Sequence, residues 1–154
     1  MSLAPTVSSY LSKHHIHYQV LGHPYSESSL ETASRANIKP EQLVKALVLE
    51  NSAGELAMIL TSASKKIHPK TLNQQLRKPY SFVPEFELAD LFKDCVEGAI
   101  PAVGQAYGLE TFVDFELLTQ PDLYIEAGDH KELVHFTGSQ FHFLMKHSKL
   151  LIDL

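Results

Sequence analysis

Two apolar runs separated by a polar turn dominate the first half of the chain. Residues 43–50 and 55–61 are rich in leucine, valine and isoleucine, and the residues between them read Asn-Ser-Ala-Gly. Asparagine and glycine are favoured where a chain reverses direction, so the pattern predicts a β-hairpin. Further short apolar runs bounded by polar residues predict strands at 18–21, 80–83, 111–114, 123–126 and 133–136.

Helices are predicted where apolar positions recur every three or four residues and where a suitable first residue precedes them. Ser28 followed by Glu31 is a capping-box pattern, which predicts a helix at 29–36. Proline suits the first turn of a helix, and Pro69 and Pro84 occupy such positions. The expected helices are therefore 6–16, 29–36, 69–77, 84–92 and 139–146.

Short strands and helices in irregular order favour an α+β fold over a doubly wound parallel sheet. No linker, internal repeat or low-complexity segment divides the 154 residues, so a single domain spanning 1–154 is expected. No apolar run approaches the roughly 20 residues of a membrane span, and residues 1–11 lack the pattern of a secretion signal. A lone cysteine, Cys95, agrees with a reducing compartment, and a cytoplasmic location is expected.

Composition and missing motifs exclude several functions. A net charge of −5 argues against a protein that coats nucleic acid through a broad basic surface. The chain has no Walker loop, dinucleotide-binding glycine motif, nucleophile elbow or His-Glu-x-x-His motif. Its nine histidines do not have the spacing of metal ligands, so neither a metal nor another cofactor is expected. Cys95 is interpreted as a small buried hydrophobe rather than as a nucleophile.

One lysine lies where an apolar residue is expected. In a strand over residues 43–50, alternation places Lys45 on the same face as Leu43, Leu47 and Leu49. Burying an unpaired ammonium group is costly, so the side chain must reach water at the sheet edge or meet an anion in a cleft. Two interpretations stay open, a lysine that protects an edge strand and a lysine that binds a ligand.

Two loops carry further candidate chemistry. In residues 97–104, Gly98 permits close approach to the backbone, whose amides could then face a ligand; the alternative is a simple connector. Residues 126–130 read Glu-Ala-Gly-Asp-His between two apolar strands. Taken alone, this segment predicts a hairpin turn with His130 exposed at its tip.

The strand lysine, the glycine–proline loop and the late Ala-Gly-Asp-His segment, in this order, resemble the YbaK/ProX family of tRNA editing domains. This family also includes the insertion domain of bacterial prolyl-tRNA synthetases. The similarity spans about residues 20–143 and implies a mixed, barrel-like β-sheet surrounded by helices. It also implies an aminoacyl-tRNA deacylase, a hydrolase that cleaves the ester bond of mischarged aminoacyl-tRNA. The implied partner is the acceptor end of the tRNA, with an aminoacyl-tRNA synthetase as a possible second partner and no membrane.

The resemblance assigns roles to individual residues. Lys45 holds the terminal adenosine and its phosphate, the loop from Gly98 cups the aminoacyl carbonyl and limits side-chain size, and His130 lies on the opposite wall. These three are the implied catalytic residues, and the implied substrate-binding residues are Ala99, Ile100, Pro101, Ala102 and Gly128. Many relatives carry proline at the position of Ala102, whereas this chain has Pro101 one place earlier. The family chemistry is substrate-assisted through a ribose hydroxyl, which agrees with the absence of a recognisable side-chain acid–base pair.

Editing suits this interpretation because a synthetase pocket discriminates weakly among small side chains and a second hydrolytic site must remove the errors. A single-stranded acceptor end needs a phosphate contact and a base slot rather than a wide basic surface, which agrees with the negative charge. Two alternatives remain. One is a non-catalytic binding or regulatory module, for which Ala102 is the only hint, and the other is an esterase or thioesterase for a small acyl carrier.

Overall fold

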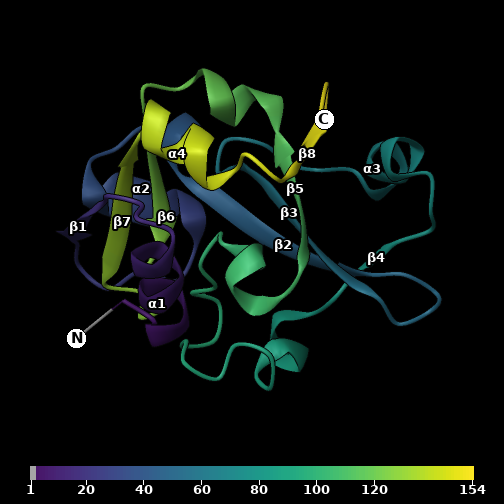
Figure 1. Ribbon diagram of the computed structural model, residues 1–154, viewed down its shortest axis with the longest axis horizontal. Coiled ribbons are helices and arrows are strands. Elements are labelled where there is room, and N and C mark those ends of the chain that lie inside the picture. Colours follow the sequence, from purple (N-terminus) through teal and green to yellow (C-terminus); the bar gives the residue numbers. More distant parts are fainter. Residues whose placement is uncertain (1–2) are drawn as a thin grey trace.

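The computed structural model describes residues 3–154 as an α+β fold, which confirms the predicted class (Figure 1). None of its helices is long and apolar enough to span a bilayer within this range. The helices are α1 (Pro5–Lys13), α2 (Ser29–Ala36), α3 (Pro69–Leu76) and α4 (Gly138–Leu144), and the strands are β1 (Gln19–Gly22), β2 (Val44–Glu50), β3 (Leu56–Ser62), β4 (Ser81–Phe82), β5 (Glu110–Asp114), β6 (Asp122–Glu126), β7 (Glu132–Thr137) and β8 (Lys149–Leu151).

The strands form two sheets of different size. The larger has the order β4-β2-β3-β5-β8, and the smaller has the order β1-β7-β6. The predicted hairpin is confirmed as β2 and β3, antiparallel along their whole length, with Lys45 opposite Thr61. Strand β5 runs parallel to β3, and β8 runs parallel to β5.

The two sheets do not close into a barrel. They are joined by one isolated parallel bridge, between Leu43 and Tyr124, and no β2–β6 ladder continues it within residues 3–154. On the same edge, β4 pairs with β2 at Leu49 and Glu50, and the Val83 backbone amide donates to the Val48 carbonyl at 2.9 Å. The barrel-like sheet that the family resemblance implies is therefore not confirmed. One edge of β2 is open between the bridge and β4.

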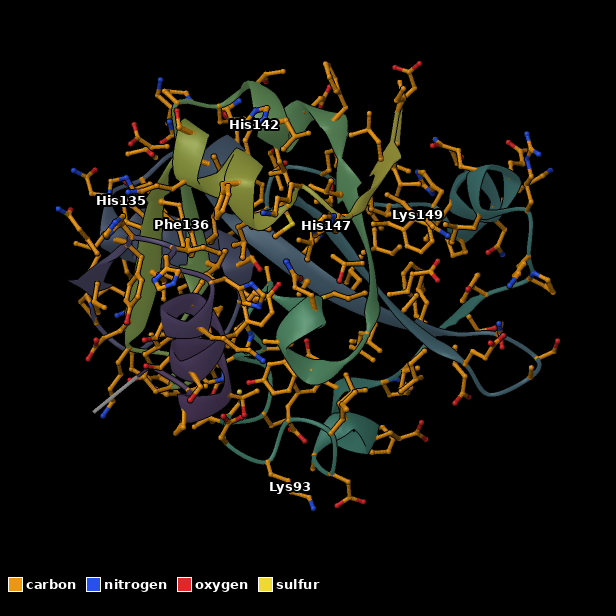
Figure 2. The ribbon with its side chains drawn as sticks, in the orientation of Figure 1. Lys93, His135, Phe136, His142, His147 and Lys149 are labelled. Carbon is orange, nitrogen blue, oxygen red and sulfur yellow. The ribbon has the colours of Figure 1, made fainter. Side chains whose placement is uncertain are left out.

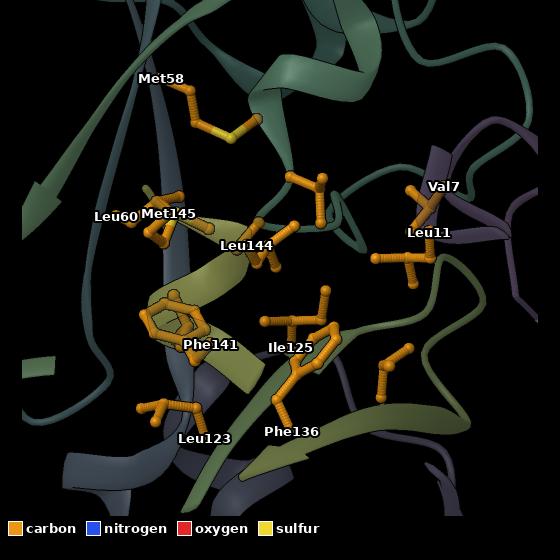
Figure 3. Close-up of a cluster of buried hydrophobic side chains, with 14 of the residues drawn as sticks. Val7, Leu11, Met58, Leu60, Leu123, Ile125, Phe136, Phe141, Leu144 and Met145 are labelled. Atoms are coloured by element: carbon orange, nitrogen blue, oxygen red, sulfur yellow. The ribbon is translucent and has the colours of Figure 1, made fainter. Parts of the chain in front are cut away.

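A large hydrophobic core lies between the two sheets and is covered by α1 and α4 (Figures 1 and 3). Phe136 and Phe141 contribute the largest fully buried side chains, and Figure 3 shows them beside Leu123, Ile125 and Leu144. Burying such a side chain contributes roughly 1.5–3 kcal/mol relative to leaving it exposed. A second cluster on the other face of β2 and β3 includes Leu49, Ala57, Ile59, Phe112 and Leu151.

The capping box predicted for Ser28 and Glu31 at the start of α2 is confirmed only in part. Ser28 Oγ accepts the Glu31 backbone amide at 3.2 Å. The Glu31 carboxylate, however, pairs with Arg35 at 3.0 Å. A complete capping box occurs instead at the start of α4, where Thr137 and Gln140 exchange both hydrogen bonds.

The predicted helix at 84–92 is wrong. Only one turn of 3₁₀ helix, Glu85–Leu88, forms there. Leu88 and Phe92 are buried, whereas most of the other side chains of this segment are exposed. Short helices depend on tertiary packing because nucleation is costly, and two buried anchors do not stabilise a longer one. Strand β8, only three residues long, was not predicted because so short a run shows no alternation.

Candidate functional site

A pocket opens along the unpaired edge of β2. It has a volume of about 160 Å³ and is called the Lys45 pocket below. Its walls come from five segments: the start of β2, the N-terminus of α2, the 3₁₀ turn that begins at Glu85, the loop around Gly98 and the end of β6. The lining residues are Glu27, Ser28, Ser29, Leu43, Val44, Lys45, Ala46, Leu47, Glu85, Gly98, Ile100 and Glu126.

Some of the implied site residues meet at this pocket and others do not. Lys45, Gly98 and Ile100 line it. The remaining residues are buried and do not line the pocket, and Ala99 and Ala102 are almost inaccessible to solvent. The assignment of His130 to catalysis and of the others to substrate binding stays a prediction. The buried residues outside the lining are Ala99, Pro101, Ala102, Gly128 and His130.

Lys45 has found an acceptor that sequence reasoning did not consider. Alternation along β2 places its side chain on the face of Leu47 and Leu49. Leu49 belongs to the second hydrophobic cluster, and Leu47 packs against that cluster. The ammonium Nζ donates to the backbone carbonyl of Lys65 at 2.8 Å. Partial burial lowers the pKa of Lys45 below its ordinary value. A lysine ammonium has three N–H donors, so a ligand anion can still be bound.

The backbone carbonyl that accepts from Lys45 belongs to Lys65, whose side chain forms an ion pair. Lys65 Nζ lies 2.9 Å from Asp114 Oδ2 and also contacts the Glu116 carboxylate. Asp114 has only 1% of its side chain exposed and accepts a second bond from Thr61 Oγ1 at 3.0 Å. This network anchors the segment after β3 to β5, and it thereby positions the acceptor of Lys45.

His130 and Gly98 are packed against each other. His130 is 3% exposed, so the expected exposed position at a turn tip is wrong. Its ring Nε2 lies 2.6 Å from the carbonyl oxygen of Glu97, which requires a proton on Nε2. The edge of the ring meets Tyr25 with 5.4 Å between ring centroids. These contacts bring the two loops together, and local sequence could not show them.

Gly98 has no room for a side chain. Its φ is +83°, a left-handed conformation that favours glycine. A Cβ there would lie 3.1 Å from Glu85 Oε2 and 3.3 Å from His130 Cε1. The sequence predicted that a group lies close to the Gly98 backbone. In the structure, these groups are the Glu85 carboxylate and the His130 ring. Gly98 also lies on the wall of the Lys45 pocket.

Gly128 joins the same loop to the N-terminal region. Its φ is +123°, and its carbonyl accepts the Val96 backbone amide at 2.8 Å. A Cβ at this position would approach Ala4 Cβ to 3.3 Å and Cys95 Sγ to 3.5 Å. Gly128 therefore supports the loop from behind rather than facing the Lys45 pocket.

Glu126 is a pocket residue that sequence reasoning did not select. Its Oε1 is buried and has no hydrogen-bond partner. Burial, together with the nearby charge of Asp129, raises the pKa of Glu126 to about 7. Alternation along β6 places Glu126 on the same face as the partly buried Tyr124. The buried face of this strand consists of Leu123 and Ile125. Alternation therefore assigns Glu126 to the polar face with Asp122, and the argument that singled out Lys45 would not have found it.

Cys95 has the environment of an unreactive thiol. Burial raises its pKa to about 12, and Sγ lies 3.4 Å from the Tyr107 hydroxyl. The thiolate is the nucleophilic form, and it is scarcely populated at neutral pH.

For the deacylation that the family resemblance implies, Cys95→Ala is accordingly expected to leave kcat/KM within about twofold of the wild-type value. The measurement is the initial rate of amino-acid release over a range of substrate concentrations. A folded variant that had lost activity would instead identify the thiol as the nucleophile.

His135 and His142, labelled in Figure 2, make separate contacts within the protein. His142 on α4 donates from Nε2 to the Leu118 carbonyl at 2.8 Å, and His135 on β7 contacts Asp122 at 2.8 Å. Within residues 3–154, no three histidine, cysteine, aspartate or glutamate residues are grouped to hold a metal ion.

Comparisons with known proteins agree with this geometry. The family model described as "Aminoacyl-tRNA editing domain" matches residues 23–144. A search of curated proteins found no match. Among solved structures, the chain is similar to one described as "Crystal structure of a putative trans-editing enzyme for prolyl tRNA synthetase", with a TM-score of 0.81 and 22% identity over 98% of each chain.

Two further solved structures share the fold. A protein described only as hypothetical has a TM-score of 0.82 and 17% identity, with 96% of this chain and 97% of that chain covered. A signal transduction protein of Marinobacter aquaeolei VT8, so named provisionally, has a TM-score of 0.72 and 16% identity over 96% of this chain and 30% of its own. At these identities the likeness shows the fold alone. The family model covers most of the chain, and the protein belongs to the aminoacyl-tRNA editing domain family, the YbaK-like family that its sequence motifs resemble.

Proposed function

We propose that this protein is a trans-editing hydrolase that cleaves the ester bond of a mischarged aminoacyl-tRNA. The observation that carries the proposal is the Lys45 pocket, where a partly buried cation and the Gly98 loop border the same small space. A volume of about 160 Å³ suits an aminoacyl group better than a whole nucleotide. The terminal adenosine and its phosphate therefore lie towards the pocket mouth, near Lys45.

The chemistry requires an activated nucleophile and a stabilised oxyanion. Backbone amides of the Gly98 loop are the proposed oxyanion donors, and each such donor is worth roughly 3–4 kcal/mol. Cys95 is protonated at neutral pH because of its raised pKa. His130 uses Nε2 to bind the Glu97 carbonyl. The vicinal hydroxyl of the terminal ribose is therefore the proposed group that activates water or attacks the carbonyl.

A panel of substrates tests the proposal against its alternatives. The purified protein is incubated with tRNAs charged with different small amino acids, and release of the amino acid is followed. A small acyl thioester serves as the comparison substrate. Hydrolysis of one or more mischarged tRNAs supports editing. Preferential cleavage of the thioester would favour a thioesterase, and binding without turnover of any substrate would favour a regulatory module.

Lys45→Ala is expected to lower kcat/KM for deacylation by about 100-fold, because a charge-assisted contact to the substrate phosphate is lost. The fold should persist, since the variant removes one partly exposed side chain and its bond to a backbone carbonyl. Single-turnover kinetics and a thermal melt measure the two effects. Lys66→Ala, at an exposed neighbouring position, is the matched control. Full activity of the Lys45 variant, or its unfolding, would contradict the assignment.

A further inference from the structure

Glu126 is a partly buried carboxylate, and one of its oxygens has no partner in the protein. Its Oε1 is shielded from water without a hydrogen-bond partner, and it joins none of the ion pairs found within residues 3–154. Burial raises its pKa to about 7, with a further contribution from Asp129. A desolvated carboxylate without a partner costs free energy. Such a residue in a pocket is a candidate for binding a ligand.

The position of Glu126 follows from the way the two sheets separate. Lys45 and Glu126 each lie two residues beyond the isolated bridge between Leu43 and Tyr124, on β2 and β6. In a continued parallel ladder the two side chains would be neighbours on one face. Instead both residues line the Lys45 pocket, and the Lys45 ammonium is bound to the Lys65 carbonyl. The pocket therefore has a cation and an unpaired carboxylate on two of its walls.

We propose that Glu126 binds the α-ammonium group of the aminoacyl ester and thereby selects substrates with a free amino group. This inference rests on the proposed editing function. The aminoacylated end of a tRNA carries negative phosphates and one positive group, the ammonium. Lys45 binds a phosphate and Glu126 binds the ammonium group, each by charge-assisted hydrogen bonds. The role is one of specificity and takes no part in bond cleavage.

The chemistry of the pocket favours an organic cation of this kind. Within residues 3–154, no three acidic, histidine or cysteine side chains are grouped to hold a metal ion. The Gly98 loop, assigned to the ester carbonyl, borders the same pocket. An amino group is attached to the carbon next to that carbonyl, so both can be bound at once. An N-acylated substrate lacks the charge and would leave the carboxylate unpaired, which discriminates against it.

The test compares the wild type with Glu126→Gln, and with Glu87→Gln as an exposed control. The substrates are the aminoacyl-tRNA that the wild type cleaves fastest and the same tRNA after acetylation of its α-amino group. The wild type is expected to prefer the free amine by at least about 30-fold in kcat/KM. Glu126→Gln should raise KM for the free amine about 10-fold with little change in kcat. The variant should therefore prefer the free amine over the acetylated substrate less strongly than the wild type does. The control should match the wild type.

A thermal melt tests the state of Glu126 without substrate. The folded pKa lies above the unfolded value, so ionisation of Glu126 destabilises the fold as pH rises from the unfolded pKa to the folded one. Glu126→Gln should therefore raise the melting temperature at about pH 8, and the gain should disappear near about pH 4.5. Absence of the gain would show that Glu126 is not an uncompensated buried carboxylate, and would overturn the inference.

The kinetic outcomes separate this inference from the function on which it rests. If the wild type cleaves aminoacyl-tRNA and Glu126→Gln keeps the full preference for the free amine, the inference fails and the editing function stands. If the variant lowers kcat equally on both substrates, Glu126 acts in the chemical step and the specificity role is wrong. If the wild type cleaves no aminoacyl-tRNA, the editing function itself fails.

Discussion

A tRNA whose terminal ribose lacks the hydroxyl next to the aminoacyl ester is expected to be hydrolysed at least about 1000-fold more slowly than the normal substrate. The proposed mechanism assigns activation of the nucleophile to that hydroxyl. The thiol of Cys95 has its pKa raised to about 12 by burial, and the Nε2 of His130 is bound to a backbone carbonyl. Removing the ribose hydroxyl should therefore remove the nucleophile's activation. Amino-acid release under single-turnover conditions measures the effect.

Binding provides the control for this experiment. The deoxy substrate keeps its phosphates, its adenine and its ammonium group, so its affinity should be nearly unchanged in a filter-binding assay. Rapid cleavage of the deoxy substrate would show that a protein group performs the activation. In that case Glu126, whose pKa of about 7 suits proton transfer, would be the first residue to examine.

Lys65→Met is expected to lower the free energy of unfolding by about 3 kcal/mol, because it leaves a buried carboxylate without its cation. Asp114 has 1% of its side chain exposed and lies 2.9 Å from Lys65 Nζ. The Thr61 hydroxyl and the Glu116 backbone amide remain as donors to Asp114. The expected loss of unfolding free energy is therefore at the lower end of the range for breaking a buried ion pair. Equilibrium unfolding in urea at neutral pH measures the change.

Lys66→Met is the matched control, since this neighbouring side chain is exposed. Its effect should stay within about 0.5 kcal/mol. The double variant Lys65→Met/Asp114→Asn should recover part of the loss, because the uncompensated charge is removed. A Lys65 variant as stable as the wild type would show that the pair does not anchor the segment after β3.

Local patterns in the sequence predicted most of the helices and strands of this fold, with the exceptions of the segment 84–92 and strand β8. The apolar runs at 43–50 and 55–61 and the polar turn between them predicted the hairpin, and alternation placed Lys45 on the face of Leu47 and Leu49. These features depend on neighbours two residues apart, so a sequence reports them directly. The order of elements likewise predicted the α+β class, and the ordered motifs identified the family.

Contacts between distant segments decided the candidate site. The burial of His130 depends on the Glu97 carbonyl, 33 residues away, and the orientation of Lys45 depends on a carbonyl 20 residues away. The segment 84–92 lacked the tertiary packing that a full helix requires. Because β2 and β6 meet at only one bridge, the sheets stay open and a pocket forms between Lys45 and Glu126. The sequence alone thus determined most of the strands and the chemical groups they carry. Only the tertiary structure decided which groups share a pocket, because strand pairing across long separations depends on the packing of the whole chain.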